Sequence, residues 1–383
     1  MTASKPLLVA PSGRTRSLLS AFTLTVALAS SLSADQIYLV SGDPIEDCTI
    51  VAETMSEVTY KDSKRKEQSV PAADVLSIDY SKVPNLVQRA DTAVKEDDLS
   101  LAYELFSEYL TGHLEDRPEK RQLWAPAYAA NQIIDLNEIT GDPKGTVKAA
   151  KVLIDKFPDS RYVPGAYMTM ATAMAEMQDE AGAKSTLDKL ENLIVSKDLS
   201  KRWSLECRLF KILVDSALRG EPRRTALSAI ETDAGGEYPT VRNRATVALG
   251  ESHLVDAGPT GKGGEAALAK ARGLFEDVIA DPSADEETLA GAYTGLGDCQ
   301  FQVAAASREA EDINESLMTF LRVVVLYRDE VRYAPKAMFY AGRCFNLLGS
   351  DDDNDRANKL YSRVIRNHET STWADQARDF RKK

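Results

Sequence analysis

The stretch Tyr293-Thr294-Gly295-Leu296-Gly297 decides the fold, because a small residue and an aromatic follow it in the next helical segment. That pair is Ser316 and Phe320, four residues apart. Two further copies share the arrangement: Leu249-Gly250 with Ala271 and Phe275, and Ala341-Gly342 with Ala357 and Tyr361. A glycine in one helix and a small-x3-aromatic pair in the next, repeated along the chain, predict stacked helical hairpins.

Seven such hairpins fit between about Asn85 and the C-terminus. Each second helix has one central apolar residue, in order Phe106, Ala150, Leu187, Ile230, Phe275, Phe320 and Tyr361. Their spacings of 44, 37, 43, 45, 45 and 41 residues exceed the roughly 34 of a strict tetratricopeptide repeat and overlap the roughly 40 to 47 of HEAT-type repeats. The glycine and Ala-x3-aromatic signatures, and the ending Phe157-Pro158-Asp159-Ser160, nevertheless resemble the tetratricopeptide family. The extra length falls in loops such as Ala257–Gly264.

The resemblance implies a mainly α protein, in which residues 85–383 form a solenoid of about seven helix-turn-helix hairpins. The last stretch, residues 372–383, combines Trp373, Ala377 and Phe380 with basic residues. We expect it to be the polar-faced capping helix that such arrays need.

Residues 1–34 have the layout of an export signal. Lys5, Arg14 and Arg16 precede an apolar run of 15 residues, Leu18–Leu32, and small residues follow it up to Ala34. A membrane-spanning helix needs roughly 20 apolar residues, so we expect cleavage near Ala34, with an uncleaved anchor as the alternative. The mature protein is then exported, to the periplasm or the cell surface of a bacterium.

Residues 35–80 have the periodicity of strands, with residues 81–84 as a linker to the helices. Apolar side chains alternate with polar ones around Ile37, Ile50 and Val58, and Ser41-Gly42-Asp43-Pro44 predicts a turn. The pattern resembles small SH3-like or Sm-like β-barrels. Two roles remain open for this β module: a sheet that caps the end of the solenoid, or a small recognition module.

The charge balance argues against nucleic acid as a partner. The chain has a net charge of −12, and removal of residues 1–34, which hold three basic and no acidic residues, makes it −15. Binding to a phosphate backbone needs a basic surface. We therefore expect no nucleic-acid partner and no membrane span after cleavage.

The four cysteines are too scattered for a disulfide framework. Cys299 and Cys344 follow Gly297 and Gly342 by two residues each, so they lie at matching heights on neighbouring first helices. Packed helix axes lie about 8–10 Å apart, whereas a disulfide needs Cα atoms within about 7 Å. We expect buried thiols, with a bond between these two as the alternative.

The remaining motifs do not predict catalysis or metal binding. The glycines of Gly258–Gly263 have the wrong spacing for a phosphate loop. Asp351, Asp353 and Asp355 open like a calcium loop, but Arg356 replaces the glycine that must turn. We expect no catalytic residue, no cofactor and no metal.

The predicted function is therefore binding: a non-enzymatic protein-interaction scaffold of the bacterial cell envelope. Members of the tetratricopeptide family usually hold a protein or peptide along the concave face lined by the first helices. By register with the glycines, the residues predicted there are Arg208, Lys211, Asp215, Arg244, Glu251, Asp298, Lys336, Phe339 and Arg343. The alternatives are a structural protein that self-associates as a homo-oligomer and an accessory subunit of an envelope enzyme or assembly complex.

Overall fold

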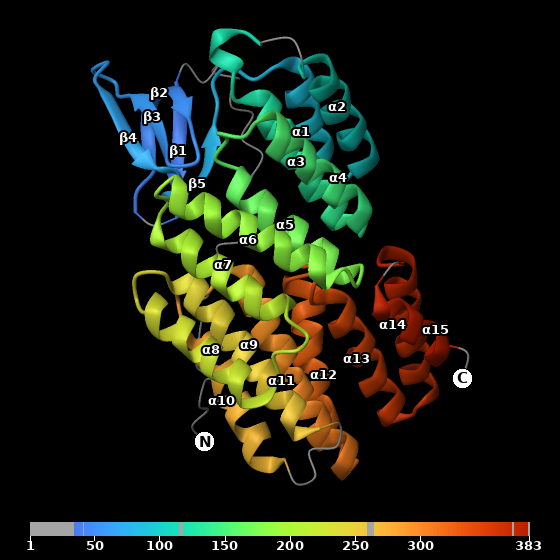
Figure 1. Ribbon diagram of the computed structural model, residues 1–383. Helices are drawn as coiled ribbons and strands as arrows, with labels where there is room; N and C mark the ends of the chain where they lie inside the picture. Colours follow the sequence, from blue (N-terminus) through green and yellow to red (C-terminus); the bar gives the residue numbers. More distant parts are fainter. Residues whose placement is uncertain (1–33, 41, 115–117, 259–263, 370, 382–383) are drawn as a thin grey trace, which may run out of the picture.

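A small β-sheet precedes a long array of helices in the computed structural model, which describes residues 34–40, 42–114, 118–258, 264–369 and 371–381 (Figure 1). These residues form five strands, fifteen α-helices and two short 3-10 helices. The predicted export signal lies outside the described residues except for Ala34.

The sheet is an antiparallel meander whose last strand returns beside the first. Its strands are β1 (Asp35–Leu39), β2 (Ile45–Glu53), β3 (Glu57–Lys61), β4 (Glu67–Pro71) and β5 (Val75–Asp79), in the order β4-β3-β2-β1-β5. A 3-10 turn, Ala72–Asp74, joins β4 to β5. Its core consists of Ile37, Cys48, Val58, Val75 and Ile78, which include two of the positions that the alternation predicted. The resemblance to SH3-like or Sm-like barrels stays a prediction.

The helices alternate as first and second members of seven hairpins, followed by one further helix. The hairpins are α1 (Asn85–Lys95) with α2 (Leu99–Gly112), α3 (Ala125–Ile139) with α4 (Pro143–Lys156), α5 (Val163–Glu176) with α6 (Glu180–Ser196), α7 (Lys201–Val214) with α8 (Gly220–Ala234), α9 (Pro239–Ala257) with α10 (Glu265–Ala280), α11 (Glu286–Ser307) with α12 (Ala310–Leu326), and α13 (Ala334–Leu348) with α14 (Asp351–Asn367). The last helix is α15 (Thr372–Arg381). The predicted fold class, a solenoid of about seven hairpins after a small β module, is confirmed.

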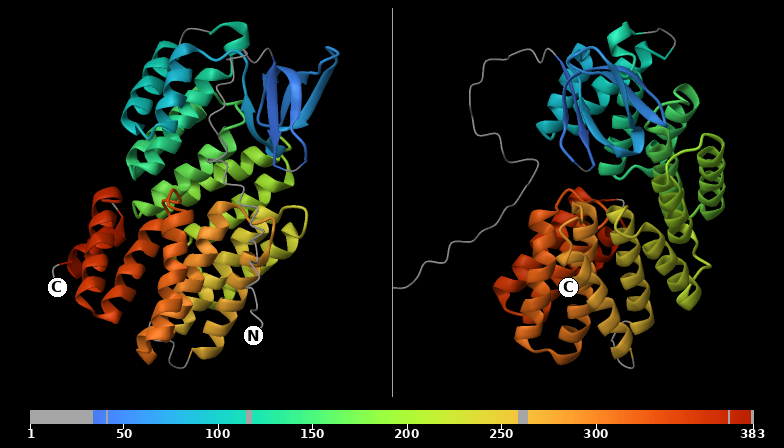
Figure 2. Two further views of the ribbon diagram at one scale, coloured as in Figure 1. Left: turned by 180° about the vertical axis from the view of Figure 1, so that it is seen from behind. Right: turned by 90° about the vertical axis from the view of Figure 1, so that its left-hand side faces the viewer.

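The array is curved. Figure 2 shows it passing from α1–α4 at the top, through α5–α8 at one side, to α9–α15 below. The first helices α5, α7, α9, α11 and α13 contact one another in sequence order, and α15 contacts α13. Each hairpin thus buries its apolar face against its neighbours, as a repeat array requires.

Aromatic rings of second helices lie directly on glycines of first helices. A Cβ built on Gly250 would come within 2.7 Å of the Phe275 ring, on Gly297 within 2.7 Å of the Phe320 ring, and on Gly342 within 2.5 Å of the Tyr361 ring. All three rings are fully buried. Because atoms do not approach this closely in a packed interior, only glycine fits beneath each ring.

Phe275 also connects consecutive hairpins. Its ring lies against Gly250 of α9 and against Gly295 of α11, the first helix of the next hairpin. The ring therefore fills the space between the two hairpins, as the repeated small-x3-aromatic pattern predicts.

The β module docks on the helices through a buried ion pair and an aromatic stack. Glu53 of β2 pairs with Arg161 at 2.8 Å, and both side chains are less than a tenth exposed. The hydroxyl of Tyr80 donates to Glu53 at 2.6 Å, while its ring stacks on Trp124 with ring centres 3.6 Å apart. Arg161 and the Tyr80 hydroxyl donate to different carboxylate oxygens of Glu53. These two hydrogen bonds offset part of the free-energy cost of burying the charges.

Two hydrogen bonds to backbone carbonyls extend this interface along the array. The backbone N–H of Met55 donates to the carbonyl of Asp159 at 2.9 Å, and Arg202 of α7 donates to the carbonyl of Ala73 at 2.6 Å. The module therefore reaches the starts of α3, α5 and α7. It runs along one edge of the array and spans three hairpins, a wider contact than a cap on the first hairpin would make.

The four cysteines, Cys48, Cys207, Cys299 and Cys344, are free and buried. The thiol of Cys344 lies 3.5 Å from the hydroxyl of Ser316, the small residue of the sixth hairpin. The prediction that Cys299 and Cys344 are buried free thiols is confirmed.

Replacing Gly297 by alanine should destabilise the protein, because the new methyl group overlaps the buried Phe320 ring. We expect a loss of about 1–3 kcal/mol in the free energy of unfolding, measured by denaturant titration. Gly273 of α10 is the matched control, since a Cβ there meets nothing within 4 Å. Gly273→Ala should stabilise by roughly 0.5–1 kcal/mol through helix propensity; equal effects of the two substitutions would contradict the packing described here.

Candidate functional site

One face of α9 forms the floor of a groove between α7 on one side and α11 and α13 on the other. The residues of α9 that line it recur every three or four positions: Arg244, Val247, Ala248, Glu251, Leu254 and Val255, followed by Gly258 just after the helix. This is the spacing of one helix face. Two hollows along this face meet at Glu251, which lines both.

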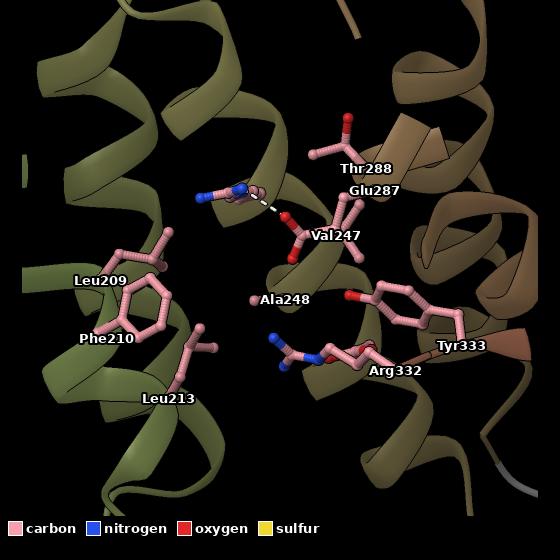
Figure 3. Close-up of a pocket in the computed structure, with 11 residues that line it drawn as sticks. Leu209, Phe210, Leu213, Val247, Ala248, Glu287, Thr288, Arg332 and Tyr333 are labelled. Carbon is pink, nitrogen blue, oxygen red and sulfur yellow. Dashed lines mark hydrogen bonds and ion pairs between the residues drawn. The ribbon is translucent and has the colours of Figure 1, made fainter. Parts of the chain in front are cut away.

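The first hollow is narrow and has one apolar wall. Leu209, Phe210 and Leu213 of α7 form that wall, while Arg332 and Tyr333, just before α13, lie opposite (Figure 3). Figure 3 shows the Tyr333 hydroxyl and the Arg332 guanidinium pointing into the space between the walls. The free volume is about 20 Å³, room for about one water molecule.

The second hollow is wider and more polar. Leu254 and Val255 of α9, Asp298 and Gln302 of α11, and Lys336 of α13 line a space of about 410 Å³. The side-chain oxygen of Gln302 is buried there without a hydrogen-bond partner among the described residues. The two hollows lie next to each other along α9 and share Glu251; together they are called the groove.

Most charges in the groove are already paired. Arg244 pairs with Glu287 of α11 and lies 4.0 Å from Glu206 of α7, and Lys336 pairs with Asp298. Burial lowers the pKa of the Arg244 guanidinium, but the Glu287 and Glu206 carboxylates outweigh it, so its pKa is raised. Arg244 therefore stays charged and ties three first helices together.

Two charges in the groove have no such partner. Neither Glu251 nor Arg332 has an ion pair within 4.0 Å among the residues that the structure describes, although both line the narrow hollow. Arg332 is exposed and Glu251 is half-buried. Both charges lie in the same narrow hollow as the apolar wall of α7.

The groove lining combines an apolar wall with charged side chains. In the part of the chain that the structure describes, its lining contains no serine, cysteine or histidine, so no nucleophile is placed beside a histidine base there.

Four residues predicted from the sequence do lie together in this groove: Arg244, Glu251, Asp298 and Lys336. All four lie on α9, α11 and α13, where Gly250, Gly297 and Gly342 fix the register.

Three predicted residues on or next to α7 do not line the groove. Arg208 pairs with Asp233 of α8 at 2.7 Å, Lys211 with Asp188 and Glu191 of α6 at 2.6 and 2.7 Å, and Asp215 with Lys184 of α6 at 3.0 Å. Their partners belong to second helices, so these side chains turn away from the groove. The predicted register was wrong because α7 contains no glycine to fix it.

Phe339 and Arg343 are also corrected, because α15 lies against that part of α13. Phe339 is 1% exposed and its ring centre lies 5.6 Å from that of Trp373 and 5.5 Å from that of Phe380. The Arg343 guanidinium stacks over Phe380 at 4.3 Å. Phe339 is therefore a core residue, and Arg343 packs against an aromatic cluster.

The sequence prediction missed the apolar wall and the pair Arg332 and Tyr333. Phe210 and Leu213 are only half-buried, and their spacing of three along a first helix was the available signal. Arg332 and Tyr333 precede α13, so a search confined to first helices passes over them.

The seventh hairpin provides the decisive comparison with known families. Residues 336–371, which span most of α13 and all of α14, match the tetratricopeptide repeat family. This hairpin is similar to a tetratricopeptide repeat. The resemblance drawn from the glycine and small-x3-aromatic signature is confirmed by this match.

Among solved structures, a tetratricopeptide repeat protein from Parabacteroides merdae ATCC 43184 matches the chain. The match has a TM-score of 0.42 and 10% sequence identity, and it covers 78% of this chain and 96% of that one. A search of curated proteins finds no match to the chain.

Glu330, two residues before Arg332, should make stability depend on pH. Burial, then the neighbouring carboxylates of Glu287, Asp285 and Glu286, raise its pKa to about 7. The folded state therefore holds this proton more tightly than the unfolded state, so the stabilisation is complete at low pH and is lost as the pH rises through 7. We expect the free energy of unfolding to fall between about pH 5 and pH 8 by a larger amount than in Glu330→Gln.

Denaturant titrations of both proteins across this pH range provide the measurement. Because all other titrating groups are shared, the difference between the two curves isolates Glu330. Parallel curves would show that Glu330 titrates normally.

Proposed function

We propose that this protein is a non-enzymatic scaffold that binds a segment of a partner protein in the groove over α9. The observation that carries the proposal is the groove. Its wider hollow of about 410 Å³ can take side chains of a bound segment, and at its narrow end the apolar wall of α7 faces the Arg332 guanidinium and the Glu251 carboxylate. Apolar contact supplies affinity, and these two charges fix the orientation of the bound segment.

The repeat architecture supports the same function. The seventh hairpin is similar to a tetratricopeptide repeat, and repeats of this kind generally mediate protein interactions. Stacked hairpins create extended surfaces that suit elongated partners. The ion pairs of Arg244 and Lys336 join α9, α11 and α13 across the groove, so its walls are held in place before a partner arrives.

We further propose that this scaffold works in the bacterial cell envelope. The support is the sequence of residues 1–34, whose basic start, short apolar run and small residues have the pattern of an export signal. None of the described helices is long and apolar enough to cross a membrane.

Photo-crosslinking in cells tests the groove directly. Phe210 is replaced by a photoreactive phenylalanine analogue in the full-length chain, and irradiated cells are analysed by mass spectrometry for adducts. We expect a discrete protein to be joined at this position, because Phe210 lies on the wall of the hollow.

Tyr103 of α2 is the matched control, an aromatic that is 43% exposed and does not line the groove. The same analogue placed there should not capture that protein. Adducts at both positions to the same extent, or none at Phe210, would contradict the proposal.

A further inference from the structure

A row of lysines follows the exposed side of α4, outside the groove. Lys144, Lys148 and Lys151 recur at intervals of four and three residues, so they lie on one stripe of the helix, and Lys156 follows five residues later, beside the stripe at the end of the helix. All four are exposed. At about 1.5 Å per residue, the row extends over about 18 Å.

None of these lysines has an ion pair within 4.0 Å among the described residues. Other lysines do pair, such as the exposed Lys197 with Asp159 and the half-buried Lys211 with Asp188 and Glu191. The α4 row contains one carboxylate, Asp155. An acidic protein of net charge −12 thus presents a local stripe of unneutralised positive charge.

The surface around the row is open and has no formed pocket. The lysines and Asp155 surround a shallow hollow of about 370 Å³ whose other lining residues are Val147 and Val152, so α4 alone provides it. Both valines are half-buried, and the lysine stems can lie along them while the ammonium groups reach outward.

We propose that the lysine row of α4 docks the protein on an anionic lipid surface. The complementary charge is that of phosphate headgroups, which attract clustered lysines without requiring a fixed geometry. The docking is peripheral, because the stripe has two half-buried valines and no aromatic or leucine that could insert into the acyl region.

The composition of the row favours a lipid surface over a protein partner. Protein interfaces are enriched in aromatic residues and arginine and depleted in lysine. Lysine ammonium groups are strongly hydrated point charges on flexible stems, which suit a diffuse layer of headgroups more than a fitted contact. The hollow contains none of the aromatic or arginine side chains that usually form the centre of a protein interface.

The overall negative charge does not prevent this docking. Exposed charges farther apart than the Debye length, about 8 Å at physiological ionic strength, are largely screened. Only groups close to the surface then contribute, and there the four lysines outnumber Asp155.

Sedimentation with vesicles tests the proposal. The chain from Asp35 to Lys383, which contains every described strand and helix, is mixed with vesicles of phosphatidylcholine containing phosphatidylglycerol, and separately with pure phosphatidylcholine. We expect the protein to bind the anionic vesicles alone, and salt to weaken this binding.

The triple variant Lys144→Gln, Lys148→Gln, Lys151→Gln should reduce the partition coefficient roughly 100-fold, at about fivefold per lysine, and Asp155→Asn should increase it.

Three lysines scattered over α1, α6 and α10 provide a charge-matched control. Lys95, Lys189 and Lys270 are exposed and lack ion pairs among the described residues but form no row, so Lys95→Gln, Lys189→Gln, Lys270→Gln changes the net charge equally. This variant should bind nearly as well as the unaltered protein. The proposal would be overturned by an equal loss of binding in both triple variants, by no binding to anionic vesicles, or by binding to soluble polyglutamate in preference to vesicles. Circular dichroism confirms that each variant is folded.

Discussion

The contact between an aromatic ring of one helix and a glycine of the helix before it is the constraint on which the array depends. Phe275 on Gly250, Phe320 on Gly297 and Tyr361 on Gly342 bring each pair of helices closer than any side chain at the glycine would allow. The rings are completely buried. The removal of their apolar surface from contact with water therefore stabilises this close packing. Phe275 extends the effect to the following hairpin through Gly295.

The groove is a consequence of this packing. Close contact within and between hairpins places α7, α9, α11 and α13 side by side, and the faces that they do not bury form its floor and walls. Ion pairs across the groove, such as Arg244 with Glu287, then join neighbouring first helices. In the first half of the array, the β module contacts the starts of α3, α5 and α7 through Trp124, Arg161 and Arg202. Both halves of the curved array are therefore stabilised by contacts between parts of the chain that are distant in sequence.

The sequence predicts the parts of this structure that depend on short-range spacing. The glycine and the small-x3-aromatic pair lie within one hairpin, and they located the last three hairpins and four residues of the groove. The sequence does not predict contacts between elements that are distant in the chain. Phe339 was predicted on the concave face, but α15 covers it. The side of α7 that faces the groove could not be predicted without a glycine to set the register. Arg332 was missed because it lies in a loop, where helical periodicity says nothing about direction.

A double-mutant cycle on Gly297 and Phe320 tests the central claim most directly. The free energy of unfolding is measured for the unaltered chain, for Gly297→Ala, for Phe320→Leu and for the double variant. If the ring on the glycine sets the helix distance, Gly297→Ala costs about 1–3 kcal/mol beside Phe320 and much less in the Phe320→Leu background, where the smaller side chain leaves room for the methyl group. An equal cost in both backgrounds would show that the ring does not determine how closely these helices pack.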